Sequence, residues 1–155
     1  MRELFLTFFY SGKSPVAPGT MGSLASIPPA LLVLHYLSPS TLFLLALLIS
    51  IVAIREINIY EKRSGTHDDS KIVIDEVAGM WIALSLSGFS VAQVVLSFIF
   101  FRLLDIYKPS YIGRIDRDVK GGLGVMGDDL LAGVLAGLLS ALFYTYVYQP
   151  YLAIF

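Results

Sequence analysis

The sequence contains no cysteine among its 155 residues. This absence excludes a thiol nucleophile, a disulfide framework and a thiolate metal site, and it leaves oxygen atoms and two imidazoles as metal ligands. Charge is also scarce, because 15% of the residues are charged while 56% are hydrophobic. A soluble domain is nearer half apolar and a quarter charged. The composition therefore favours a membrane protein.

Two further features are missing. The formal net charge is -1, with no unpaired basic face, so a nucleic-acid partner is not expected. The N-terminal apolar run is short and lacks a small-residue cleavage site, so a removable signal peptide is not expected either.

The charged residues are confined to three segments, 2–13, 55–76 and 102–129. Between and after them lie uncharged stretches of 41, 25 and 26 residues, namely 14–54, 77–101 and 130–155. A helix needs about 20 apolar residues to cross the hydrocarbon of a bilayer. Each stretch is long enough to place helices in a membrane.

Turn and cap residues predict an all-α fold. Gly65 should end one helix and Pro109 should follow another, while Ser23, and Asp128 or Asp129, should cap two more. The expected helices cover roughly 24–37, 41–64, 72–85, 90–107 and 128–148. We expect a single domain over residues 1–155, a polytopic membrane bundle of about five helices, some short or partly spanning, with ordered loops at 14–23 and 110–127.

The stretch 77–101 leaves the membrane topology open. As a hairpin, it gives about a dozen residues per pass, or ~18 Å, which is less than the ~30 Å hydrocarbon thickness. As a single span, it would divide the charged segments between the two membrane faces. We favour the hairpin, which places all Lys and Arg residues and the polar loops on the cytoplasmic side. Ionisable groups then enter the membrane, where they usually mark a functional site.

Carboxylates gather at three expected helix ends. Asp75 and Glu76 lie inside the apolar run "KIVIDEVAGMW", where an unpaired charge is costly. The other members are "HDD" (67–69), Asp105, and "DD" (128–129). Carboxylates without soft ligands suit a hard cation, Mg²⁺ in particular. The alternative is that they are helix caps and surface charges.

Basic residues accompany these acids. Arg102, Asp105 and Lys108 are spaced at three and share a helix face, which would suit a phosphate held between a metal and cations. An internal ion pair between Arg102 and Asp105 explains the same pattern.

Two glycine-containing loops, "APGTMGS" (17–23) and "GLGVMG" (122–127), could present backbone donors to an anion. Turn chemistry alone would also explain them. Gly133 and Gly137 form a GxxxG pair, which predicts close helix packing rather than catalysis.

Four motifs together resemble a known family. "SPVAPGTMGS", "HDDSKIVIDEVAGMWIAL", "FRLLDIYKPSYIGRIDR" and "VKGGLGVMGDDLLAG" are similar, in this order and spacing, to the motifs of phosphatidylglycerophosphatase A, a bacterial inner-membrane lipid phosphatase. The resemblance extends from about Ser14 to Gly137. It implies hydrolysis, dependent on Mg²⁺, of the phosphate monoester of phosphatidylglycerophosphate, giving phosphatidylglycerol and inorganic phosphate.

On this basis we expect a multi-pass protein of the bacterial cytoplasmic membrane, with its active site facing the cytoplasm and a phospholipid as its partner. A homo-oligomer is compatible with the sequence. The expected catalytic residues are Asp69, Asp75, Glu76 and Asp129. The expected substrate-binding residues are Thr20, Arg102, Lys108 and Lys120. The expected metal ligands are Asp75, Glu76, Asp105, Asp128 and Asp129. Asp69 or Asp75 would act as the base.

Two other classes of membrane protein share some of these features. A membrane transferase that uses a nucleotide-activated lipid would also use Mg²⁺, but its pattern requires further Asp residues after Asp129, and 130–155 contains none. A small cation transporter needs charges along a path through the membrane, and neither 77–101 nor 130–155 supplies them.

Overall fold

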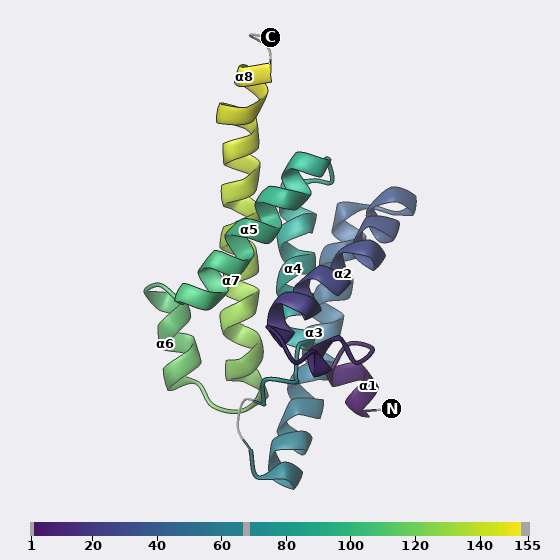
Figure 1. The fold of residues 1–155 in the computed structure, drawn as a ribbon, viewed down its shortest axis with the longest axis vertical. Coiled ribbons are helices and arrows are strands. Elements are labelled where there is room, and N and C mark those ends of the chain that lie inside the picture. The colour runs from purple at the N-terminus through teal and green to yellow at the C-terminus, as the bar shows by residue number, and fades with distance from the viewer. Residues whose placement is uncertain (1, 67–68, 153–155) are drawn as a thin grey trace.

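The computed structural model describes residues 2–66 and 69–152, and these residues form helices joined by short loops (Figure 1). In chain order the elements are α1 (Arg2–Leu6), the 3-10 helix η1 (Ser11–Lys13), α2 (Pro18–Tyr36), α3 (Pro39–Ser64), α4 (Ile74–Ser87), α5 (Val91–Tyr107), α6 (Tyr111–Asp118), α7 (Gly122–Phe143), the π-helical η2 (Tyr144–Tyr148) and α8 (Gln149–Leu152). The all-α class is confirmed. The expected number of about five helices omitted α1 and α6 and the short elements.

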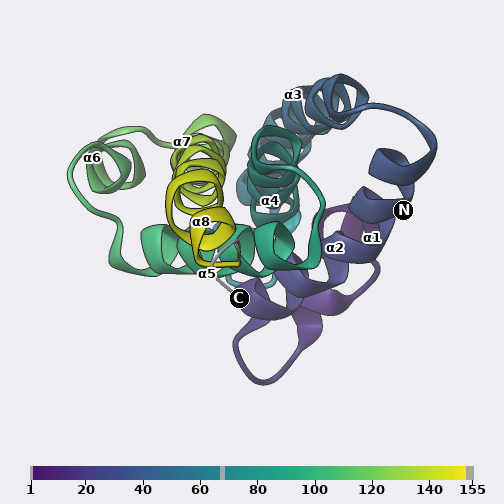
Figure 2. The ribbon, with the colours of Figure 1, turned by 90° about the horizontal axis from the view of Figure 1, so that it is seen from above.

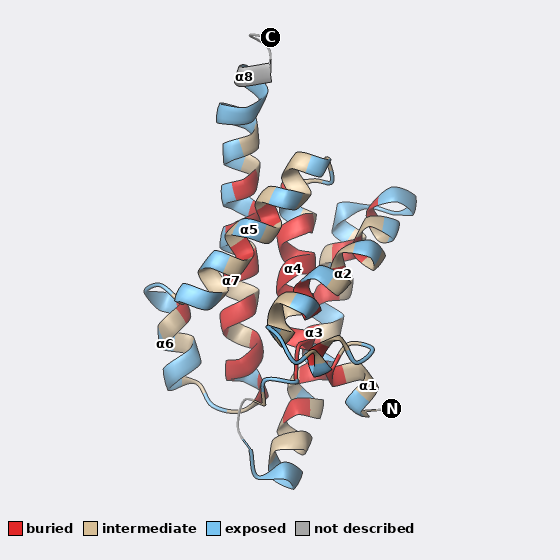
Figure 3. Cartoon of the chain, viewed as in Figure 1, coloured by how far each residue is buried: buried red, intermediate tan, exposed pale blue. Residues whose placement is uncertain are grey.

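Helix α4 is the centre of the bundle. It contacts α2, α3, α5 and α7, which surround it when the molecule is seen along its long axis (Figure 2). Almost every turn of α4 is buried, whereas the surrounding helices carry exposed faces (Figure 3). The exposed faces of α3 and α5 are rich in large apolar side chains such as Leu48, Ile51, Val91 and Val95. Apolar side chains that point outward on several helices suit a lipid environment.

Small residues bring α4 and α7 into close contact. A Cβ atom on Gly133 would lie 2.2 Å from the Gly79 carbonyl oxygen, and one on Gly137 would lie 2.7 Å from the Ala83 carbonyl oxygen. No side chain fits in these gaps, so the two backbones touch. The packing role expected of Gly133 and Gly137 is therefore observed.

The chain reverses between α4 and α5, as the hairpin interpretation of 77–101 requires. Gly88 ends α4 with a φ of 105°, and Ser90 begins α5. The Ser90 hydroxyl accepts a hydrogen bond from the Gln93 backbone, while the Gln93 side chain accepts one from the Ser90 backbone. This capping box fixes the turn. The reversal returns the charged end of α5 to the first turn of α4.

Two helices begin earlier than the sequence suggested. Helix α2 begins at Pro18 rather than near residue 24, so Ser23 is an interior residue and not a cap. Proline suits a first helical position because its missing N–H has no partner there anyway. Helix α7 begins at Gly122, so Asp128 and Asp129 are not caps either.

The cap of α7 comes from another helix. The Gly122 backbone N–H donates to the Asn58 side-chain oxygen of α3 over 2.8 Å. Gly121 precedes it with a φ of 74°, a conformation that favours glycine. A cap supplied from 64 residues away cannot be found by reading the local sequence.

Two helical stretches are long and apolar enough to cross a membrane, namely Pro39–Ser64 and Gly122–Tyr148. The second combines α7 and η2 without a break. Helices α4 and α5 are shorter, with 14 and 17 residues.

Candidate active site

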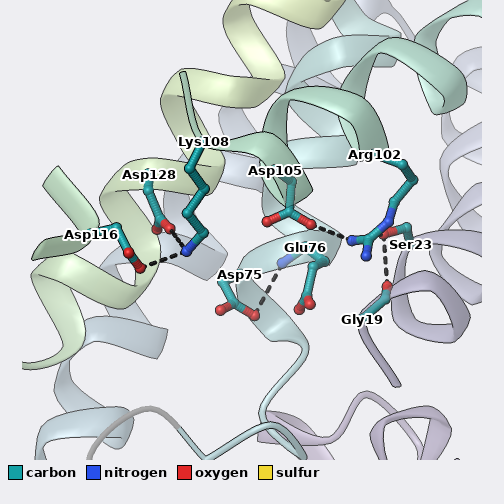
Figure 4. Close-up of polar contacts among 9 residues, drawn as sticks. All are labelled: Gly19, Ser23, Asp75, Glu76, Arg102, Asp105, Lys108, Asp116 and Asp128. Atoms are coloured by element: carbon teal, nitrogen blue, oxygen red, sulfur yellow. Dashed lines mark hydrogen bonds and ion pairs between the residues drawn. The ribbon is translucent and has the colours of Figure 1, made fainter. Parts of the chain in front are cut away.

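A cavity of about 470 Å³ lies where the charged ends of α4 and α5 meet the beginnings of α2 and α7. Its charged lining residues are Asp75, Glu76, Arg102, Asp105, Lys108, Asp116, Asp128 and Asp129. They come from α4, α5, α6 and α7 and, in the case of Lys108, from the residue that follows α5. The convergence of acids expected from the sequence is thus observed in the structure (Figure 4).

Three carboxylates form the tightest cluster in the cavity. One oxygen each from Asp75, Glu76 and Asp129 lies within 4.8 Å of the others. Asp75 and Asp129 are 8% and 3% exposed, so water screens their mutual repulsion poorly. Such a group is costly unless a cation neutralises it.

The position of each carboxylate follows from the helix packing. Asp75 and Glu76 lie in the first turn of α4, where the helix dipole favours negative charge. A Cβ atom on Gly79, one turn further along, would lie 2.6 Å from the Asp129 carbonyl oxygen. The close contact between α4 and α7 therefore sets the distance between the acids.

The cluster fits a hard divalent cation. Glu76 Oε2 is buried and has no hydrogen-bond partner within residues 2–66 and 69–152. Three carboxylates with an unpartnered oxygen, in a protein without thiols, are a donor set of the kind that binds Mg²⁺. Asp75, Glu76 and Asp129 could hold such an ion.

Arg102 lies beside the cluster and is held by α5 and α2. Its guanidinium forms a close ion pair with Asp105, one helical turn along α5, and lies 3.5 Å from the Ser23 hydroxyl. That hydroxyl donates to the Gly19 carbonyl over 2.8 Å. The ion pair weighed as the simpler explanation is present, and both partners also line the cavity.

The first turn of α2 approaches the cluster closely. A Cβ atom on Gly19 would lie 2.1 Å from Glu76 Oε1 and 3.3 Å from the Arg102 guanidinium. A side chain at position 19 would therefore have to displace the Glu76 carboxylate. The stretch 17–23, expected to be a loop, is largely a helix start that borders the cavity.

Lys108 forms a second charged cluster on the opposite side of the cavity. Its ammonium donates to Asp116 over 2.5 Å and to Asp128 over 2.7 Å. Burial alone would lower the pKa of Lys108, but the hydrogen bonds to Asp116 and Asp128 outweigh it and raise the pKa well above its ordinary value. The two carboxylates therefore favour the charged form of Lys108.

Other predicted site residues lie outside the cavity lining. Asp69 accepts a hydrogen bond from the Tyr60 hydroxyl over 2.7 Å and one from the Lys71 backbone over 3.1 Å. The Tyr60 hydroxyl lowers the pKa of Asp69. These contacts describe a turn-stabilising residue. Thr20 follows the lining residue Gly19 in α2 without itself lining the cavity, and Lys120 is exposed.

His67 and Asp68, members of the expected acidic set, lie outside the described residues. Asp116 was missed from the sequence, whereas Gly19 and Ser23 belong to the stretch 17–23 that was expected to face an anion but were not named individually as site residues. Asp116 carried a weak signal, since it lies eight residues after Lys108 within a short charged segment. The role of Gly19 had no local signal, because it depends on contact between α2 and α4.

Comparison with known proteins agrees with this geometry. The family model described as phosphatidylglycerophosphatase A matches residues 4–144. The chain belongs to the phosphatidylglycerophosphatase A family. The resemblance stated from four motifs is thereby confirmed.

Individual relatives extend this result. The chain is 43% identical over 140 residues to phosphatidylglycerophosphatase A of Escherichia coli, covering 88% of this chain and 80% of that protein. It is 33% identical over 135 residues to the protein of the same name in Haemophilus influenzae, covering 86% and 83%. It is also 40% identical over 144 residues to a putative phosphatidylinositol-3-phosphatase of Bacteroides thetaiotaomicron, covering 87% and 88%. No solved structure matches the chain.

Proposed function

We propose that the protein hydrolyses the phosphate monoester of phosphatidylglycerophosphate, releasing phosphatidylglycerol and inorganic phosphate. The observation that carries the proposal is the carboxylate cluster Asp75, Glu76 and Asp129 beside Arg102 and Lys108 in one cavity. A phosphate monoester requires cations around its oxygens and an activated water, and this cavity offers groups for both.

Mg²⁺ is the cofactor that fits the cluster best. When bound by Asp75, Glu76 and Asp129, it would supply charge stabilisation to the phosphate oxygens and lower the pKa of water. Asp105 and Asp128 also line the cavity. Asp105 is already paired with Arg102, and Asp128 with Lys108, so both are less suited to binding the metal ion than the other three acids. Asp128 keeps one buried oxygen without a partner among the described residues.

The chain's own cations would bind and orient the phosphate. Arg102 can present two N–H groups to phosphate oxygens, while Lys108 acts as a point charge. Asp75 would accept a proton from the attacking water, since it lines the cavity whereas Asp69 does not. Water attacks phosphorus and the bond between phosphorus and the glycerol oxygen breaks. That oxygen takes up a proton from water, while Asp75 returns the proton it accepted to water.

The membrane placement is part of the proposal. Two apolar helices of spanning length and the reversal at Gly88 support a bundle whose charged ends share one side. By the positive-inside rule that side would be cytoplasmic. The cavity would then open near the lipid headgroups. Thr20 and Lys120, close to the cavity along the chain, would contact the substrate further from the reacting phosphate.

Phosphate release from a defined lipid panel tests the function. Purified protein in detergent should hydrolyse phosphatidylglycerophosphate with added Mg²⁺, and a chelator should stop the reaction. Phosphatidylinositol 3-phosphate belongs in the panel, because a relative carries that activity in its name. If the protein prefers the inositol lipid, that lipid is its substrate and phosphatidylglycerophosphate is not. Inactivity on every lipid in the panel would refute the proposed phosphatase function.

The same preparation tests the route. With ¹⁸O-labelled water, direct attack by water places label only in the released phosphate. Label in a carboxylate side chain would show that an acyl phosphate formed and was opened by water at its carbonyl carbon.

A further inference from the structure

A second groove adjoins the catalytic cavity and shares Pro18 and Ser70 with it. It has a volume of about 460 Å³ and is lined by Glu3, by residues 12–15 at the end of η1 and just after it, and by Lys71. Resting on the proposed function, we propose that this groove binds the diester phosphate of the lipid substrate, with Lys13 and Lys71 as its cations.

Backbone packing holds the two lysines in the same groove. A Cβ atom on Gly12 would lie 2.1 Å from the Lys71 carbonyl oxygen, so the loop and the segment before α4 touch without a side chain between them. The Val73 N–H donates to the Leu6 carbonyl over 3.0 Å and fixes the same two segments. Lys13 follows Gly12 directly. The two cations are therefore positioned by the fold, although they lie 58 residues apart in the sequence.

The charge of the groove suits one anion. Lys13 forms an ion pair of 2.7 Å with Glu3, and both side chains are largely exposed, at 44% and 61%. An exposed pair of this kind is weak, so a phosphate can compete with Glu3 for the lysine. Two lysines facing one carboxylate leave a net positive charge beside the acidic cluster of the catalytic cavity.

The same loop carries exposed aromatic and apolar side chains. Phe9 is 73% exposed and Val16 is 74% exposed, and the Lys13 ammonium lies 4.7 Å from the Tyr10 ring centroid. Exposed aromatic residues beside lysines are typical of segments at the level of lipid headgroups. The groove is thus placed where a phospholipid diester would lie.

The chemistry of the substrate requires two anion sites in neighbouring positions. Phosphatidylglycerophosphate carries its monoester on one end of a glycerol and its diester on the other. Phosphatidic acid carries a monoester but no diester. A groove for the diester would therefore distinguish these two lipids, while the catalytic cavity treats their monoesters alike.

The test compares Lys13→Met and Lys71→Met with the matched control Lys62→Met, an exposed lysine in the last turn of α3. Full-length protein is assayed in mixed micelles for kcat/KM. For phosphatidylglycerophosphate, kcat/KM of each groove variant should fall about tenfold. That factor corresponds to the lower end of the free energy of a hydrogen bond to a charged group. For phosphatidic acid, measured as a substrate or as a competitive inhibitor, neither should change. The control should match the wild type with both lipids.

Glu3→Gln adds a test with the opposite sign. Removing the competing carboxylate should lower the KM for phosphatidylglycerophosphate. If the ion pair were only structural, Glu3→Gln and Lys13→Met would instead reduce kcat/KM to the same extent. If the groove variants lose kcat/KM equally with both lipids, or with neither, the inference is wrong. The proposed function would still stand in that case, provided that the wild type hydrolyses phosphatidylglycerophosphate normally. Absence of wild-type turnover on phosphatidylglycerophosphate would overturn both.

Discussion

The two charged clusters of the cavity differ in how their charges are balanced. Lys108 pairs with both Asp116 and Asp128, so that cluster contains a cation of its own. Asp75, Glu76 and Asp129 face one another, with a buried Glu76 oxygen that lacks a partner in the described part of the chain. A buried charge needs a partner, so the paired cluster can stand alone while the carboxylate cluster needs a cation from outside. We therefore expect the carboxylate cluster to hold the metal ion, and the two acids around Lys108 to position its ammonium for the phosphate.

Neutral substitutions in the carboxylate cluster should have the largest effect on activity. Asp75→Asn, Glu76→Gln and Asp129→Asn should each lower kcat by at least about a hundredfold, because each removes a proposed ligand of the ion that stabilises the transition state. Stability without Mg²⁺ should be equal or higher, since repulsion between buried acids falls. Phosphate release and thermal unfolding in detergent measure the two effects. Full activity in all three variants would show that the site is misplaced.

Removing the cation of the paired cluster should lower stability in addition to weakening the proposed phosphate binding. Lys108→Met leaves Asp128 buried without its partner and should cost about 1–3 kcal/mol of unfolding free energy, the penalty for an unsatisfied buried group. Adding Asp128→Asn should recover most of that loss. If the double variant unfolds as early as the single one, the pairing explanation is wrong.

The contact between α4 and α7 should set the geometry of the carboxylate cluster. Gly79→Ala would place a methyl group 2.6 Å from the Asp129 carbonyl oxygen and from the Phe101 ring, and should cost about 1–3 kcal/mol from overpacking. It should also raise the Mg²⁺ concentration needed for half-maximal activity. Gly127→Ala is the control, because its Cβ would meet only a side-chain methyl of Ile115 at 3.1 Å. An equal response from both variants would argue against this contact.

The smallest expected effect concerns Asp69 and Tyr60, outside the cavity. Tyr60→Phe should reduce stability by about 1 kcal/mol or less, the usual net value of one hydrogen bond. The folded-state pKa of Asp69 is lowered, so this stabilisation is present above the unfolded pKa, near 3.8, and is lost as the pH falls through the folded value. The free energies of unfolding of the wild type and the variant should therefore differ at pH 7 and become equal at acidic pH. A constant difference across this range would contradict the assignment.

Several features of the site could be predicted from the sequence. Asp75 and Glu76 stand out because they interrupt an apolar run, and Arg102 with Asp105 stands out because of its helical spacing. Gly133 and Gly137 indicated a close helix contact, which the structure places between α4 and α7. Helix starts were less predictable, because the cap of α7 is the distant Asn58.

The sequence by itself determined the all-α class, the apolar stretches and the chemical character of the site, because periodicity, hydropathy and residue type are local properties. Only the tertiary structure decided which acids meet. It joined Asp75, Glu76 and Asp129, paired Asp128 with Lys108, and left Asp69 beside Tyr60. The reason is physical: distances between carboxylates depend on where backbones can approach, and that is fixed by glycine contacts between helices far apart in the chain.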